Sequence, residues 1–308
     1  MGRKRHGRPI HGWMVVDKPA GITSNAVVGA IKRATDAAKV GHGGTLDPLA
    51  TGVLPIALGE ATKTVSYAMD GVKRYRFVVR WGEQRSTDDA EGEVIAESDV
   101  RPSEDQMRGV TDHFIGEIEQ VPPCYSAIKI GGRRAYDLAR ADEPVEMVAR
   151  MVTIHGLELE SVIDTDHAAF LATCGKGTYM RALARDLALQ LGTRGHIQRL
   201  RRIQVGPFTE DQAFNLNDFC ASDTDTTLSD FLLPIETVLA DIPALALTEQ
   251  EARRLRHGQG VPILPIANRT PLAGIAQGDT VRAMAEGRLV ALATLNGGEV
   301  RPLRVMNH

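Results

Sequence analysis

The chain has 308 residues, of which 43% are hydrophobic and 24% charged, a balance typical of a globular protein that fills two domains. Its longest apolar runs, such as residues 289–293, are too short to cross a bilayer, and no apolar signal segment opens the sequence. Three widely spaced cysteines form no C-x-x-C pair. A disulfide framework and a cysteine-based zinc site are therefore not expected, whereas a reducing cytoplasm is.

The net charge of −3 argues at first against a nucleic-acid partner, but the charge is unevenly distributed. Residues 203–252 contain ten acidic residues and no Lys or Arg, so the rest of the chain is net positive. RNA binding requires a local basic surface that neutralises phosphates, not a basic average. The charge pattern is thus compatible with an RNA partner. We expect residues 1–10 to form a flexible basic tail.

The first elements predicted are a strand over residues 11–17, a turn over 18–21, and a helix with Ser24 as its N-cap. The next segment, residues 42–52, reads HGGTLDPLATG and carries one carboxylate, Asp47, on a glycine-rich loop. Pro48 favours an extended conformation at Asp47, and the apolar run 53–58 anchors the loop to a core. On this pattern alone, an Asp-Pro pair is most often a simple turn former.

The segment from Arg74 to Trp81 alternates in polarity and predicts a strand. Tyr75 begins its apolar face, where an aromatic ring either borders a pocket or belongs to the core. The acid-rich residues 86–119 contain a predicted helix over 103–114. Residues 122–140 are rich in Lys, Arg, Gly and Tyr, which suits either a lobe that folds over a polyanion or an exposed charged helix.

Strands over 152–161 and 168–174 precede a helix with Thr178 as its expected N-cap, and Gly192 is placed to end it. Arg181 lies in the first turn of this helix, where the helix dipole disfavours a cation by roughly 0.3–1 kcal/mol. A carboxylate could offset that cost, and Asp47 is the candidate. The alternative is an Arg side chain that is simply solvated.

A second basic cluster at residues 194–202 precedes the acidic segment 209–241, which closes the first domain. After it, Thr248 and Glu251 form a capping box for a short helix that stops at Gly258. Strands are predicted over 261–264, 280–284, 288–295 and 300–306, with turns at 286–287 and 296–298. Residues 243–308 therefore form a small β-rich domain.

Seven spaced motifs resemble, in order, those of the TruB family of tRNA pseudouridine synthases. They are residues 17–24, 42–52, 59–63, 74–75, 122–127, 176–181 and 200–202. The resemblance implies an α/β (α+β) catalytic domain over 11–242, built on a mixed, largely antiparallel sheet with an inserted basic lobe at about 122–152. It also implies a PUA-like RNA-binding domain over 243–308.

The implied reaction is isomerisation of the uridine at position 55, in the T-loop of tRNA, after that base has been flipped out of its stack. By resemblance, Asp47 is the catalytic nucleophile or base, Tyr75 stacks on the flipped base, and Arg181 pairs with Asp47. The other implied substrate contacts are His42 in the gap left by the nucleotide, Tyr179 and Leu200 lining the base pocket, Lys18 supporting the loop or touching a phosphate, and Lys129, Arg201 and Arg202 gripping the backbone.

The resemblance implies no cofactor, no metal, no membrane and no obligate protein partner, with the T-arm of tRNA as the partner. Gly43 and Ala141-Asp142 depart from the family pattern, but neither touches the inferred chemistry. Two other functions stay open: an RNA-binding or RNA-folding protein with an idle site, and an RNA methyltransferase. No Gly-rich strand-to-helix loop supports the methyltransferase.

Overall fold

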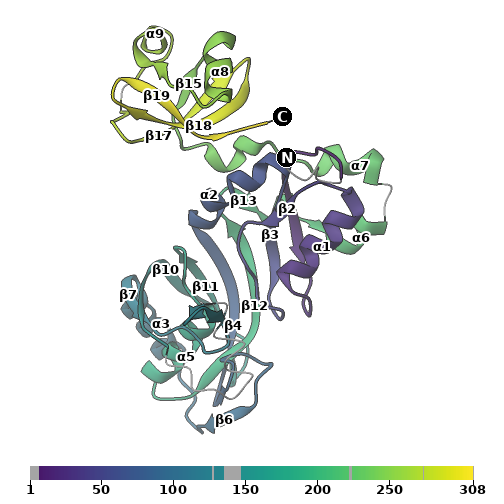
Figure 1. The fold of residues 1–308 in the computed structure, drawn as a ribbon. Helices are drawn as coiled ribbons and strands as arrows, with labels where there is room; N and C mark the ends of the chain where they lie inside the picture. The colour runs from purple at the N-terminus through teal and green to yellow at the C-terminus, as the bar shows by residue number, and fades with distance from the viewer. Residues whose placement is uncertain (1–6, 127, 135–146, 222–223, 273, 308) are drawn as a thin grey trace.

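The computed structural model describes residues 7–126, 128–134, 147–221, 224–272 and 274–307 (Figure 1). It contains a ten-stranded sheet and, at one end of the molecule, a separate five-stranded sheet. Residues 1–6 of the expected tail, and residues 127 and 135–146 of the basic lobe, lie outside the described residues. Within the described ranges, no helix is both long enough and apolar enough to span a membrane.

The large sheet is mixed and largely antiparallel, as predicted. Its strands follow the order β14 (Phe214–Asn215), β1 (Gly12–Lys18), β3 (Thr51–Leu58), β12 (Gly195–Val205), β4 (Lys73–Trp81), β11 (His167–Cys174), β10 (Arg150–Val162) and β7 (Gly116–Gln120). Only the pairs β1–β14 and β3–β12 on this path are parallel. At the side, β2 (Val40–His42) pairs with β3, and β13 (Phe208–Thr209) pairs with β12. The parallel β3–β12 pair brings the chain around residue 51 beside the chain around residue 201.

The smaller elements of this part occupy the connections between its strands. They are α1 (Ser24–Thr35), η1 (Gly59–Lys63), α2 (Val65–Asp70), β5 (Glu83–Arg85), β6 (Val94–Glu97), α3 (Glu104–Thr111), η2 (Asp112–Phe114), β8 (Lys129–Ile130), β9 (Arg133–Arg134), α5 (Met180–Gln190), η3 (Glu210–Gln212), α6 (Leu216–Ala221), α7 (Thr224–Phe231) and η4 (Ile235–Leu239). The helix predicted over 103–114 is confirmed as α3 followed by η2, with Ser103 as its cap.

Two predicted helix caps are wrong by one residue. The cap of α1 is Thr23, whose side chain accepts a hydrogen bond from the Ala26 amide, and Ser24 is the first helical residue. The cap of α5 is Tyr179, which makes no side-chain cap bond, whereas the Thr178 hydroxyl donates to the Gly175 carbonyl. In both places the hydroxyl that was expected to cap the helix bonds elsewhere. Ser24 bonds to the main chain of Leu46, and Thr178 bonds within a turn to Gly175.

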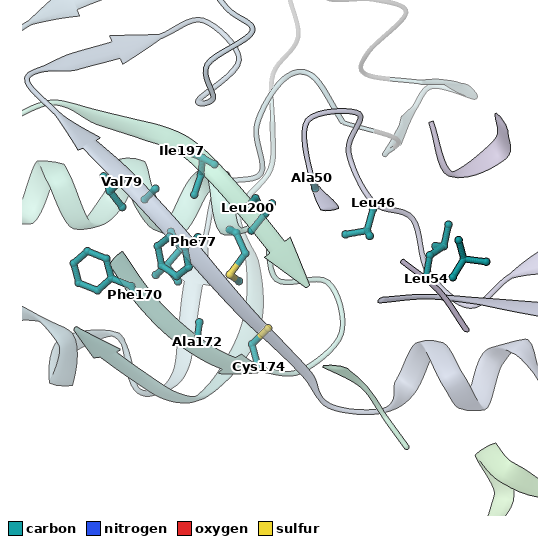
Figure 2. Packing of buried hydrophobic residues seen from close by; sticks show 14 of the residues in the cluster. Leu46, Ala50, Leu54, Phe77, Val79, Phe170, Ala172, Cys174, Ile197 and Leu200 are labelled. Atoms are coloured by element: carbon teal, nitrogen blue, oxygen red, sulfur yellow. The ribbon is translucent and has the colours of Figure 1, made fainter. Parts of the chain in front are cut away.

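The main core lies under β4, β11 and β12 and extends to the 42–52 loop (Figure 2). Phe77 stacks on Phe170 with ring centroids 5.6 Å apart, and Trp81 meets the same ring edge-on at 6.1 Å. Phe77 and Trp81 are buried while Arg76 is exposed, so the alternation predicted for this strand is confirmed. Leu46 packs in the same cluster, and this ties the loop to the core.

The C-terminal sheet has the order β15 (Ala244–Ala246), β17 (Thr280–Ala285), β18 (Arg288–Asn296), β19 (Glu299–Val305) and β16 (Val261–Pro262). The predicted capping box opens α8 (Glu249–Arg256). The strand predicted over 261–264 is wrong in its second half, because Ile263–Ala267 forms the short helix α9. Pro265 stands in the first turn of α9, where its missing N–H costs no hydrogen bond, and Ile266 is buried. We call residues 243–307 the C-terminal module.

Gly52 fixes the contact between β3 and β12, which generates a test of the fold. Its φ is +99°, and a Cβ there would lie 2.1 Å from the carbonyl oxygen of Arg202. We expect Gly52→Ala to lower the free energy of unfolding by at least about 2 kcal/mol, measured by denaturant titration. Gly116→Ala is the matched control, because Gly116 has a φ of +106° with no atom within 4 Å of its Cβ position. Equal losses for the two variants would contradict this account of the β3–β12 contact.

Candidate active site

The loop that carries Asp47 is held in place on both sides of the carboxylate. The Ser24 hydroxyl accepts from the Leu46 amide at 2.8 Å and donates to the Leu46 carbonyl at 3.0 Å. Leu46 and Ala50 are buried, and the Ala50 amide closes a turn onto the Asp47 carbonyl at 3.1 Å. Asp47 is therefore presented on a fixed turn, with its side chain 34% exposed.

Lys18, the last residue of β1, supports this loop through hydrogen bonds to main-chain carbonyls. Its side chain is fully buried, and its Nζ donates to the carbonyls of Pro19 at 2.9 Å, Ile22 at 2.8 Å and Pro48 at 3.1 Å. Burial lowers the pKa of Lys18 to about 8. These contacts support the expected role in holding the loop and argue against the alternative of a phosphate contact, because Nζ bonds three carbonyls of the protein.

Arg202 performs the same task from β12. Its guanidinium donates to the carbonyls of Val53 at 2.8 Å, Thr45 at 3.3 Å and Gly44 at 3.0 Å, and the residue is buried. These bonds and the burial of Arg202 argue against the predicted grip on a backbone phosphate. Two loop carbonyls and one β3 carbonyl satisfy a buried charge that could not otherwise be tolerated.

Asp47 forms a two-pronged ion pair with Arg181, as predicted. Arg181 Nε lies 3.0 Å from Asp47 Oδ2, and Nη2 lies 3.1 Å from Oδ1. The Arg181 side chain is only 5% exposed, and its remaining donors reach the carbonyls of Thr87 at 3.0 Å and Tyr125 at 2.9 Å. Nε also lies 3.6 Å from Asp89 Oδ2. Such parallel bonds hold both the position and the plane of a carboxylate.

The loop at residues 86–93 was missed as part of the site. Asp88 and Asp89 are both buried, and Asp88 Oδ2 accepts from Arg185 Nη1 at 2.9 Å. Burial raises the pKa of Asp88, and the Arg185 guanidinium opposes that shift. The sequence signal was present as six acidic residues without a Lys or Arg over 86–100, which require basic partners from elsewhere in the fold.

Asp47, Tyr75, Tyr179, Arg181 and Leu200 meet in one cavity of about 290 Å³. The other lining residues are Gly44, Thr45, Leu46, Met69, Lys73, Ser126, Gly175, Lys176, Gly177, Thr178, Met180 and Arg202. A pocket of this size suits a single small ligand group rather than a duplex. The loop, β4, α5 and β12 each contribute to it, and Leu200 lies close to the Phe77 side of the core (Figure 2).

The two tyrosines bring an aromatic surface to this cavity. Burial raises the pKa of Tyr75, although the nearby Arg202 guanidinium opposes the shift, so its hydroxyl keeps its proton at neutral pH. Burial also raises the pKa of Tyr179. Both rings can therefore stack on a planar ligand and donate a hydrogen bond to it.

Two predicted substrate contacts, His42 and Arg201, lie outside the described lining of the cavity. His42 ends β2, its Nδ1 accepts from the Gly44 amide at 3.3 Å, and burial lowers its pKa. Arg201 is bound to Asp17 through two bonds of 2.9 and 3.0 Å and to Glu210 at 2.5 Å, so a phosphate would have to displace a carboxylate. Lys129 lies in β8, and its side chain is not among those described.

Two lysines at the cavity were missed. Lys176 is exposed at its rim and pairs with Asp70 at 2.9 Å. Lys73 is buried and donates to the Met69 carbonyl, and burial lowers its pKa. Within the described ranges, no group of three or more His, Cys, Asp or Glu side chains is arranged to hold a metal ion. The site thus offers one oriented carboxylate, two phenols and a basic rim.

Comparison with known proteins agrees with this geometry. Residues 32–180 match the family model described as TruB family pseudouridylate synthase (N terminal domain), and residues 181–240 match that of the tRNA pseudouridylate synthase B C-terminal domain. The tRNA pseudouridine synthase B of Rhodospirillum rubrum is 59% identical over 307 residues, covering 100% of both chains. That of Gluconacetobacter diazotrophicus is 52% identical, covering 99% of this chain and 100% of the other.

Among solved structures, a chain in the crystal structure of a Cbf5-Nop10-Gar1 complex superposes with a TM-score of 0.73 at 27% identity. The match covers 96% of this chain and 84% of that one. The family models, the curated relatives and the solved structure thus all point to pseudouridine synthases or proteins of the same fold. The chain belongs to the TruB family of pseudouridine synthases.

Proposed function

We propose that the protein isomerises the uridine at position 55 of tRNA to pseudouridine, with Asp47 as the catalytic group. The reaction breaks the bond between ribose C1′ and uracil N1 and forms a bond between C1′ and C5. The C5 proton leaves and N1 gains a proton, so atoms and electrons balance without a redox partner. For this reason we propose that neither a cofactor nor a metal takes part.

The observation that carries this proposal is the ion pair between Asp47 and Arg181 at the wall of a nucleoside-sized cavity. Arg181 fixes the plane of the carboxylate through two parallel hydrogen bonds, while one third of the Asp47 side chain stays accessible to a ligand. An ionised, oriented carboxylate can act as a nucleophile or as a base on a flipped nucleoside. Position 55 itself rests on the family resemblance.

Tyr75, Tyr179 and Leu200 supply the surface against which the extruded uracil would lie. Stacking of a base on an aromatic ring contributes about 1–3 kcal/mol. Because its hydroxyl stays protonated, Tyr75 can also relay the proton that moves from C5 to N1. His42, at the end of β2, is our candidate for the side chain that fills the gap left by the flipped nucleotide.

Phosphate contacts would come from the basic residues that the structure leaves accessible. Lys176 at the rim is exposed and reaches only an exposed carboxylate, Asp70. Arg199 is exposed on β12, and Lys129 remains our candidate in the basic lobe. Contacts of this kind set register and make affinity strongly dependent on salt.

We further propose that residues 11–242 form the catalytic domain and that residues 243–308 form a PUA-like RNA-binding domain. The C-terminal module has its own five-stranded sheet and its own buried apolar cluster, which supports this division. The free thiols suit a reducing compartment, so we propose a cytoplasmic location. We also propose that the protein needs no obligate protein partner.

Asp47→Asn tests the catalytic assignment. The amide keeps the shape of the side chain but cannot act as an anionic nucleophile or base, so we expect single-turnover conversion of a T-arm stem-loop to fall at least about a thousandfold. Affinity for the RNA should change little. Asp105→Asn, at an exposed position of α3, is the control and should react like the unmodified protein. A comparable rate for Asp47→Asn would leave an RNA-binding protein as the better description.

Arg202→Lys tests the role of the buried guanidinium in holding the loop. A lysine keeps the charge but cannot serve the carbonyls of Gly44, Thr45 and Val53 together, so the Asp47 turn should loosen. We expect kcat to fall about tenfold while the tRNA affinity and its salt dependence stay the same. The control is Arg76→Lys on the exposed face of β4, which keeps a charge beside Glu160 and should leave kcat unchanged. A weaker salt dependence in Arg202→Lys would restore the phosphate contact rejected above.

A further inference from the structure

The 59–63 turn, with sequence GEATK, is a family motif that the catalytic site does not use. It forms η1, and none of its residues lines the cavity. Its two charged side chains face the C-terminal module instead. Lys63 Nζ donates to the Val305 carbonyl at 2.6 Å, and Glu60 Oε2 accepts from the Asn307 amide at 2.8 Å.

Glu60 and Lys63 also pair with each other at 2.5 Å, with side-chain exposures of 16% and 24%. Burial alone would raise the pKa of Glu60, but the bonds from Lys63 and from the Asn307 amide outweigh it and lower that pKa. The Glu60 carboxylate is therefore held in its charged form. Lys63 thus binds the main-chain carbonyl of Val305, and Glu60 binds the main-chain amide of Asn307, where β19 of the C-terminal module ends.

Apolar contacts extend this docking surface. Leu289, Leu292 and Met306 of the C-terminal module belong to the same buried cluster as Trp13 and Ala61 of the other part. Glu236 Oε1 also accepts from the Leu289 amide at 3.2 Å. The combination of a buried cluster with directed bonds to main-chain atoms defines one orientation of the module.

The same turn is joined directly to the catalytic loop. β3 runs from Thr51, just beyond the Asp47 loop, to Leu58, and the 59–63 turn follows at once. Residues 52–58 are buried, so β3 is a rigid connection about 25 Å long at roughly 3.3 Å per residue. The C-terminal module thus lies at the far end of this strand from Asp47, as the ribbon also shows (Figure 1). An RNA that reaches both places must extend well beyond the loop with the target uridine.

The C-terminal module carries the charge that such an extension requires. Residues 243–308 contain eight Arg and five acidic residues. Arg253, Arg288 and Arg304 are exposed, and no carboxylate in the described part of the chain pairs with them. Arg304 directly precedes Val305, whose carbonyl binds Lys63. Exposed guanidinium groups suit the phosphates of an RNA backbone.

We propose that Glu60 and Lys63 are positioning residues, which fix the C-terminal module so that its arginines bind tRNA outside the T-arm while the target uridine occupies the cavity. This inference rests on the proposed function, because it takes tRNA as the substrate. It assigns the GEATK motif to recognition of the whole tRNA and not to the chemistry.

The test compares full-length tRNA with a T-arm stem-loop of the same sequence. For Glu60→Gln and Lys63→Met we expect KM for full-length tRNA to rise about tenfold, with kcat within about twofold of the unmodified protein. Both constants for the stem-loop should stay within about twofold. Lys63→Arg keeps a donor for Val305 and should recover most of the loss. Glu104→Gln, which breaks the exposed pair with Arg108, is the matched control and should behave normally on both RNAs.

Amide hydrogen exchange gives a second readout. The amides of residues 305–307 should exchange at least about tenfold faster in Glu60→Gln, while those of β4 keep their protection. Equal losses on both RNAs, or no change in KM for full-length tRNA despite faster exchange, would overturn the inference. If the unmodified protein converts neither RNA, the proposed function itself fails, which is a separate result.

Discussion

The site depends on one interaction, the pairing of Asp47 with a guanidinium that water barely reaches. Arg181 lies in the first turn of α5, where the helix dipole disfavours a cation, and it is almost fully buried. It tolerates this place because two carboxylates and two carbonyls surround it. Losing one partner of such a pair typically costs about 3–5 kcal/mol, so each charge keeps the other in position.

The rest of the fold can be understood as support for that pair. Lys18 on β1 and Arg202 on β12 donate hydrogen bonds to carbonyls of the Asp47 loop. Strand β3 pairs with both β1 and β12 and so brings the two cations to the same loop. The 86–93 loop closes the other side of Arg181 through Asp89. The buried cations thus hold the backbone of the active site in place. Among the described residues that line the cavity, Asp47 is the only anionic side chain.

Periodicity and family resemblance predicted the strand over 74–81, the capping box at Thr248, the mixed sheet and the Asp47–Arg181 pair. It misjudged positions where tertiary contacts override a local signal. Ser24 bonds to Leu46 instead of capping α1, and Ile263 begins a helix within the segment 261–264 that reads as a strand. A basic residue looks the same in sequence whether it meets phosphate or carbonyl groups. Arg202 was therefore assigned to RNA and Lys18 left between the loop and a phosphate, although both side chains are buried against the loop.

The most direct test of the central claim is the single-turnover rate of Arg181→Lys with saturating tRNA. Lysine retains the positive charge beside Asp47 but cannot form two parallel bonds to its oxygens. If the orientation of the carboxylate is what matters, the rate should fall at least about a hundredfold while the affinity for tRNA stays within about threefold. A rate within a few-fold of the unmodified protein would show that charge alone suffices and would contradict the account.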